Sequence, residues 1–199
     1  GVIFSILGLL TTVFLVKDTT HFVNAESLTS KVPLLTNVWK ETSWKHQNLG
    51  SVTLNGLVNN LNDGVVWGLL PVLLMQKGFG IGQIGIIAGI YPAVWGISQL
   101  FTGKLGDSHC KKQIITSGML LQALAIIFMA LSSSLSFLIF ASVLLGFGTA
   151  LVYPNFLSVV AEWTHPSQRA ESLSIFRLWR DSGYVFGAIL SGILADTFG

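Results

Sequence analysis

The sequence contains few charged residues and a single cysteine. Lys, Arg, Asp and Glu make up 10% of the 199 residues, against about 25% in an average soluble domain. So few charges cannot cover a soluble protein of this size. The 51% of hydrophobic residues and the mean hydropathy of +0.68 indicate a chain whose solvent is a bilayer. Cys110 has no second cysteine with which to form an intrachain disulfide.

Several motifs of other protein classes are absent from the sequence. No run of Lys and Arg is long enough for a nucleic-acid partner. No glycine-rich phosphate loop occurs, so nothing supports an ATP-driven pump. The four histidines lack the spacing of metal ligands, and His109 beside Cys110 is not a site by itself. We therefore expect no enzyme, no cofactor and no metal site.

The apolar residues gather in long runs. A hydrocarbon core about 30 Å thick requires roughly 20 apolar residues per helix, and five runs approach that length besides a partial one at Val2–Val16. The runs are Leu49–Met75, Ile81–Gly103, Gln113–Leu131, Leu135–Ala161 and Leu173–Ala195. They do not alternate polar and apolar residues, which excludes an outer-membrane barrel. The sequence therefore predicts an all-α integral membrane bundle.

The basic residues are distributed unevenly about these runs. With alternating spans, ten of the 11 Lys and Arg residues lie on one side, and only Lys77 lies on the other. The polar stretch 17–47 is on the basic side. Because cytoplasmic loops are enriched in Lys and Arg, we expect a multi-pass protein of the cell (plasma or inner) membrane with residues 17–47 in the cytoplasm.

Two helix ends share a short pattern. Gly103–Asp107 and Gly192–Asp196 both read G-x-L-x-D, three spans apart and therefore on opposite sides of the membrane. An inverted three-helix repeat, which is typical of secondary transporters, predicts this relation. A chance match between two glycine-rich helix ends is the alternative.

The sequence resembles the major facilitator superfamily. The segment GKLGDSHCKK matches the family pattern G-x-x-x-D-x-x-G-[RK]-[RK] at Gly103, Asp107, Lys111 and Lys112, with Cys110 in place of the second glycine. That departure fits the weaker copy of the motif in the C-terminal half of such proteins. Further matches are LLGFGTALVYPN (144–155), HPSQR (165–169) and FRLWRDSGYVFGAILSGILAD (176–196).

The resemblance implies a partial bundle of the family's type with inverted three-helix repeats. Residues 1–16 would be the end of a helix like the sixth, 17–47 the central cytoplasmic loop, and 48–199 helices like the seventh to eleventh. The N-terminal half of the same protein and a twelfth helix would be missing. The implied function is secondary transport by alternating access, with efflux favoured over uptake. The implied partners are the bilayer, a small organic or drug-like solute and protons. A non-transporting receptor or scaffold, or an integral membrane enzyme, remains the alternative.

One candidate site lies inside the run Leu49–Met75. Asp63 falls near its middle, where a charged side chain costs roughly 2.5–3.5 kcal/mol on insertion scales and commonly faces a cavity or a partner. Asn55, Asn59, Asp63 and Trp67 recur every four positions and therefore share one face of the helix. This face favours a substrate path in which Asp63 exchanges protons. The residues of this path are Asn55, Asn59, Asn60, Asn62, Asp63 and Trp67. Alternatively, the asparagines join helices and Asp63 forms one buried pair.

A second candidate is the charge cluster Arg177, Arg180, Asp181 and Tyr184, at the beginning of the last run. Local pairs four residues apart are feasible there. The cluster is either a gate or anion contact, since an arginine fork holds carboxylates well, or an anchor at the helix entrance.

The resemblance also implies a gate, in which Gly103, Asp107, Lys111 and Lys112 form a motif in the loop Lys104–Lys112 and Glu162 is a partner for one of the lysines. The alternative is that these lysines only set the topology. Finally, Tyr91-Pro92 and Tyr153-Pro154 are expected to interrupt two membrane helices.

Overall fold

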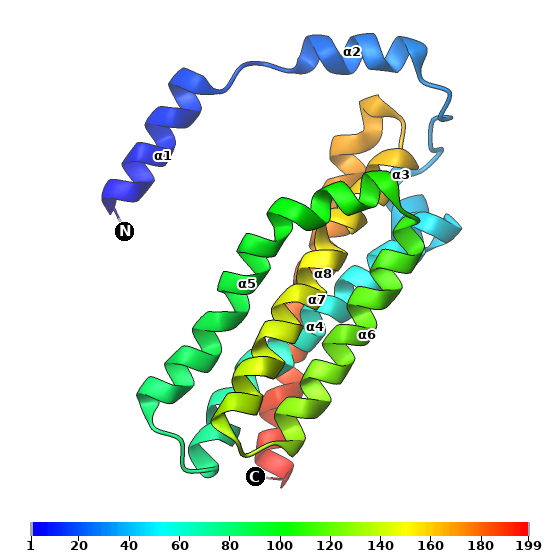
Figure 1. Cartoon of the computed structure of the whole chain (residues 1–199). Helices are drawn as coiled ribbons and strands as arrows, with labels where there is room; N and C mark the ends of the chain where they lie inside the picture. The colour runs from blue at the N-terminus through cyan, green and yellow to red at the C-terminus, as the bar shows by residue number, and fades with distance from the viewer. Residues whose placement is uncertain (1, 199) are drawn as a thin grey trace.

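A computed structural model describes residues 2–198, and it is helical throughout (Figure 1). The long helices are α4 (Gln47–Gln76), α5 (Ile81–Ser108), α6 (Lys111–Leu131), α7 (Leu135–Glu162) and α8 (Arg169–Phe198). Shorter elements are α1 (Val2–Leu15), α2 (Thr20–Thr29), α3 (Val38–Lys40), the π-helical turn η1 (Glu41–Lys45) and the 3₁₀ turn η2 (Pro166–Gln168). No strand occurs in the described residues, and the prediction of an all-α fold is confirmed.

Helices α4 to α7 are each long and apolar enough to cross a membrane. Helix α8 is as long as α4 but carries several charges in its first half, so it is less apolar than these four. Helices α1 and α2 would add a further span only if taken together as one helix bent by 58°. The runs predicted from the sequence therefore all form helices, but only four meet the length and apolarity of a span on their own.

Some boundaries differ from those predicted. The segment Lys104–Lys112 is not a loop, because α5 continues to Ser108 and only His109 and Cys110 separate it from α6. The helical hydrogen bonds persist to the His109 N–H, which donates to the Leu105 carbonyl. Pro92 and Pro154 do not end their helices either, since α5 and α7 both run through their prolines.

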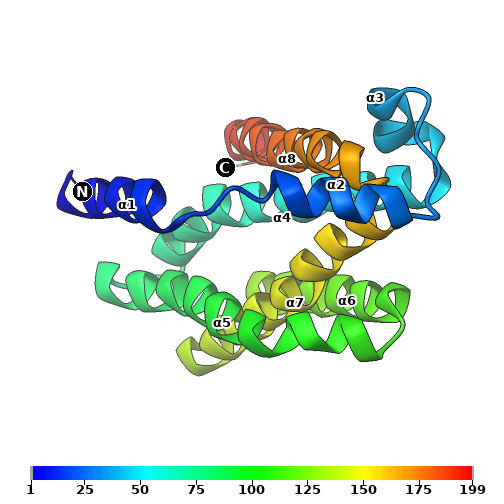
Figure 2. The same cartoon turned by 90° about the horizontal axis from the view of Figure 1, so that it is seen from above.

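The segment 17–47 is also not a plain loop, since it contains α2, α3 and η1. It lies across one end of the bundle, where α4, α6 and α8 begin and where α5 and α7 end (Figures 1 and 2). We call this the linker end. Helix α1 has no buried residue and lies apart from the bundle in Figure 1.

Helices α4 and α8 run parallel and pack through small residues. A Cβ atom on Gly183 would lie 2.8 Å from the backbone nitrogen of Leu61, and one on Gly187 would lie 3.0 Å from Cα of Gly64. Helices in membranes associate largely through such close backbone approach. Gly183 and Gly187 are four residues apart on one face of α8, so this face determines how the two helices are rotated against each other.

Helix α7 forms the corresponding contacts with the remaining helices. It runs parallel to α5, where a Cβ on Gly146 would lie 2.6 Å from the Tyr91 carbonyl oxygen. It runs antiparallel to α6, where a Cβ on Gly148 would lie 2.9 Å from the Gly118 carbonyl oxygen. The first helix of each predicted repeat thus packs in parallel on the second helix of the other, which is the pairing that inverted repeats produce.

Candidate functional site

The carboxylate of Asp63 lies at the seventeenth of the 30 residues of α4 and is 3% exposed. The Tyr91 hydroxyl on α5 donates to Oδ1 at 2.9 Å, and the Tyr184 hydroxyl on α8 approaches Oδ2 at 3.4 Å. Among residues 2–198, Asp63 is the one acidic side chain that is buried. The structure therefore gives it partners from two other helices.

The hydrogen bonds around Asp63 can form whether its carboxyl group is ionised or protonated. The Tyr91 hydroxyl also lies 3.4 Å from Oγ1 of Thr149, whose own hydroxyl donates to the Leu145 carbonyl. One hydroxyl has one proton to donate. If Asp63 is ionised, Tyr91 donates to it; if Asp63 is protonated, it can donate to Tyr91, which can then donate to Thr149. Both arrangements keep these oxygens hydrogen bonded.

The asparagines near Asp63 join helices to one another. Gln122 on α6 donates to Asn59 at 2.8 Å, Asn59 donates to Asn60 at 3.2 Å, and Asn60 donates to Asp181 on α8 at 3.3 Å. Asn59, Asn60 and Gln122 are all buried. This chain of amides corresponds to the alternative prediction, in which the asparagines hold helices together.

The other members of the predicted path are less enclosed. Asn55 is half-buried and donates to the Ser51 carbonyl of its own helix. Asn62 is half-buried. Trp67 packs edge-on against Tyr91, with ring centroids 5.4 Å apart. The predicted path residues thus share α4, but they face different partners.

Arg180 lies within the bundle and not at the helix entrance. It is eleven residues beyond Arg169, the first residue of α8, or about 17 Å along the helix axis. Its guanidinium pairs with Asp181 at 2.7 Å and lies 4.8 Å from the Tyr153 ring centroid on α7. This depth does not fit anchoring of Arg180 at the entrance.

The local pairs expected four residues apart are not formed. The Asp181 carboxylate accepts hydrogen bonds from Arg180 on its own helix and from Asn60 on α4, and none from Arg177. Tyr184 points its hydroxyl to Asp63 and not to Arg180. Arg177 is exposed and has no hydrogen bond or ion pair within residues 2–198.

An aromatic series connects Arg180 with Asp63. Tyr153 packs edge-on against Trp95 at 6.2 Å, and Trp95 stacks on Tyr91 at 6.4 Å. Sequence reasoning missed the roles of these rings and of Gln122 and Thr149. Two signals were available, namely a tyrosine directly before proline in each of two apolar helices and Gln122 within the apolar part of α6.

Two of the predicted gate residues, Lys111 and Glu162, contact each other at the linker end. Lys111, the first residue of α6, forms an ion pair with Glu162, the last residue of α7. Asp107 is exposed near the end of α5, and Lys112 is exposed at the start of α6. Gly103 is half-buried within α5. Of the two lysines considered as partners for Glu162, the structure therefore selects Lys111.

No group of three or more His, Cys, Asp or Glu side chains comes together in the described part of the chain in a way that could hold a metal ion. The fold and the buried network define a helical, multi-pass membrane protein. Comparison with known proteins then identifies its family.

The sequence model of the Major Facilitator Superfamily matches residues 52–199, and the chain belongs to this superfamily. Multidrug resistance protein MdtH of Aeromonas hydrophila is 30% identical over 139 residues, covering 66% of this chain and 35% of that protein. Efflux pump terJ of Aspergillus terreus is 31% identical over 151 residues, covering 72% and 29%. Uncharacterized MFS-type transporter YddS of Bacillus subtilis is 28% identical over 201 residues, covering 98% and 46%.

The chain thus spans less than half the length of each of these relatives. The family resemblance deduced from the sequence is confirmed.

Proposed function

We propose that the chain forms the C-terminal part of a secondary transporter that couples movement of a small organic solute to movement of protons. The observation that carries this proposal is the buried Asp63 carboxylate, held by Tyr91 and Tyr184 from two other helices. Buried acids within membrane helices commonly serve as proton relays. The alternative hydrogen-bond arrangements around Tyr91 allow Asp63 to gain and lose a proton without leaving an oxygen unpaired.

We further propose a drug-like substrate and efflux as its direction. Support comes from the names of two relatives, a multidrug resistance protein and an efflux pump. The substrate path would run along α4 past Asn55, Asn59, Asn60, Asn62 and Trp67 to Asp63. Residues 48–199 would form one bundle, to be completed by the N-terminal half of the protein, and residues 17–47 would face the cytoplasm of a plasma or inner membrane.

Two further roles belong to this proposal. The pair Lys111–Glu162, acting together with Gly103, Asp107 and Lys112, would close the linker end in one state and open it in the other. Arg180, Asp181 and Tyr184 would transmit the state of Asp63 to α8, because Tyr184 contacts Asp63 and Asp181 contacts Asn60. Arg177 would be the exposed member of this cluster.

The test uses the complete protein in proteoliposomes that contain a pH-sensitive dye. Candidate solutes are added to wild type, to Asp63→Asn and to Asp196→Asn, a matched change of an exposed acid at the end of α8. We expect at least one solute to move protons in wild type and in Asp196→Asn, and none to do so in Asp63→Asn.

Two results would count against the proposal. Solute-driven proton movement that persists unchanged in Asp63→Asn would place coupling elsewhere. Binding of a solute without any flux in wild type would favour a non-transporting receptor.

A further inference from the structure

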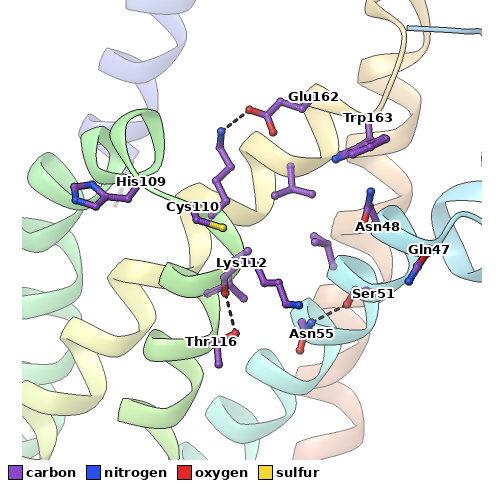
Figure 3. A pocket seen from close by; sticks show the side chains of 14 residues that line it. Gln47, Asn48, Ser51, Asn55, His109, Cys110, Lys112, Thr116, Glu162 and Trp163 are labelled. Atoms are coloured by element: carbon purple, nitrogen blue, oxygen red, sulfur yellow. Dashed lines mark hydrogen bonds and ion pairs between the residues drawn. The ribbon is translucent and has the colours of Figure 1, made fainter.

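A cavity of about 590 Å³ opens at the linker end, among the first turns of α4 and α6 and the last turn of α7 (Figure 3). It lies apart from Asp63 and from the Arg180 cluster, neither of which lines it. Its polar lining includes Asn48, Asn55, Lys111, Lys112, Thr116 and Glu162. The cavity is therefore large enough for a small molecule or a lipid head group.

The charges of this lining leave one positive charge in excess. Lys111 and Glu162 neutralise each other in an ion pair. Lys112 is the remaining charged side chain of the lining, and it has no hydrogen bond or ion pair from its ammonium group within residues 2–198. Figure 3 shows Lys112 extending across the cavity toward Asn55. Because Lys112 is exposed and its ammonium group has no partner in the described part of the chain, this group is available to bind an anion.

The backbone strengthens this positive character. Two long helices, α4 and α6, begin at the cavity, with Gln47 and Lys111 as their first residues. The beginning of a helix carries a partial positive charge and N–H groups without helical acceptors. One helix, α7, ends there, and its negative terminus lies beside the Lys111–Glu162 pair.

The side chains also offer donors. The side-chain amide of Asn48 has no hydrogen-bond partner within the described residues, and it lines the cavity together with Gln47. Phosphate and carboxylate oxygens accept hydrogen bonds from such amides and from ammonium groups. The available donors therefore match an oxyanion better than a cation or an apolar ligand.

We propose that this cavity binds an oxyanion, with Lys112 as the principal contact and the side chains of Asn48 and Asn55 beside it. The oxyanion would be the phosphate of an anionic lipid head group or a soluble phosphate. This proposal does not depend on proton coupling at Asp63, and its test needs no transport measurement.

Cys110 offers a native reporter for the test, since it lines the cavity, is exposed and is the sole cysteine of the chain. The rate at which a neutral maleimide modifies Cys110 is measured in nanodiscs of phosphatidylcholine, with phosphate or chloride at equal ionic strength. A second arm replaces part of the phosphatidylcholine by phosphatidylglycerol and omits phosphate. Protection in the first arm indicates a soluble oxyanion, and protection in the second arm alone indicates a lipid head group.

The variants decide whether the protection comes from the cavity. In Lys112→Gln we expect roughly tenfold weaker protection, the size that follows from losing one charge-assisted hydrogen bond. Lys112→Arg keeps the positive charge and should retain protection. This variant shows whether the loss in Lys112→Gln comes from the missing charge or from misfolding. Lys104→Gln removes the same charge from an exposed position on α5 outside the cavity and should behave as wild type.

Two results would overturn the proposal. One is the absence of protection in both arms. The other is equal protection in wild type and Lys112→Gln, which would show that the anion acts through general surface charge.

Discussion

Asp63 depends on two tyrosine hydroxyls that are not equivalent. Tyr91 is buried and donates at 2.9 Å, whereas Tyr184 is more exposed and lies at 3.4 Å. The shorter bond also connects Asp63 with Thr149 through the same hydroxyl. At the scale of single residues, Tyr91 is therefore the partner on which the site should depend most.

We predict that Tyr91→Phe destabilises the protein by about 1–3 kcal/mol, because a buried carboxylate loses its donor. Tyr184→Phe, the same substitution on the same carboxylate, should cost less because its bond is longer and less buried. Thermal unfolding in detergent measures both effects. Equal losses in the two variants would contradict the difference that we assign to the two hydroxyls.

Gly183 is a second residue whose size is decisive. A Cβ there would meet the backbone of α4, whereas a Cβ on Gly192, further along α8, would meet nothing within 4 Å. We predict that Gly183→Ala lowers the free energy of unfolding by about 1–3 kcal/mol through overpacking. Gly192→Ala should change it by less than about 0.5 kcal/mol. Chemical unfolding in detergent compares the two, and similar losses would show that α4 and α8 do not need this close approach.

At the scale of helices, the ends of α6 and α7 are joined by the Lys111–Glu162 pair. Glu162 is exposed, with 52% of its side chain accessible, and ion pairs in such surroundings contribute about 0–1 kcal/mol to stability. The pair is therefore a weak interaction, as the proposed opening and closing of the linker end requires.

We predict that Lys111→Glu reduces solute flux of the complete protein several-fold while the unfolding temperature changes little. The double variant Lys111→Glu with Glu162→Lys should recover most of the flux, because it restores the attraction with the charges exchanged. Flux in proteoliposomes and thermal unfolding are measured on the same preparations. Failure of the double variant to recover flux would show that the lysine acts by setting topology.

At the scale of the whole molecule, hydrogen bonds and an ion pair attach the segment 17–47 to the beginning of α8. Arg169 contacts Glu26 through both guanidinium NH groups, at 2.8 and 3.2 Å. The Gln168 side chain forms two hydrogen bonds with the backbone of Leu35. Any displacement of α8 should therefore be transmitted to this segment.

The Glu26–Arg169 interaction should depend on pH. The hydrogen bond from Arg169 lowers the pKa of the Glu26 carboxyl below its ordinary value. Because this pKa is lowered, the stabilising contribution of the Glu26–Arg169 pair is complete above the ordinary pKa of glutamate. It is lost as the pH falls through the lowered pKa of Glu26. We predict that α2 loosens in that acidic range, and that Glu26→Gln abolishes the dependence.

The measurement is the fluorescence anisotropy of a dye on Asn24→Cys in a Cys110→Ser background. A fall in anisotropy at acidic pH that persists in Glu26→Gln would exclude the Glu26–Arg169 pair as its cause.

The sequence by itself determined the helices, the family and the position of Asp63 within a membrane span. These follow from local properties, because the length of an apolar run and the positions of charges can be counted along the chain. The extent of α5 was underestimated for the same reason, since the charges of Lys104 and Asp107 end an apolar run without ending the helix.

Only the tertiary structure decided which polar side chains meet. Tyr91 reaches Asp63, and Arg180 pairs with Asp181 and lies over the Tyr153 ring. These contacts form because close approaches at Gly183, Gly146 and Gly148 set the rotation and depth of neighbouring helices. Rotation and depth depend on backbone approach between segments far apart in sequence. Residue spacing within one helix cannot specify them.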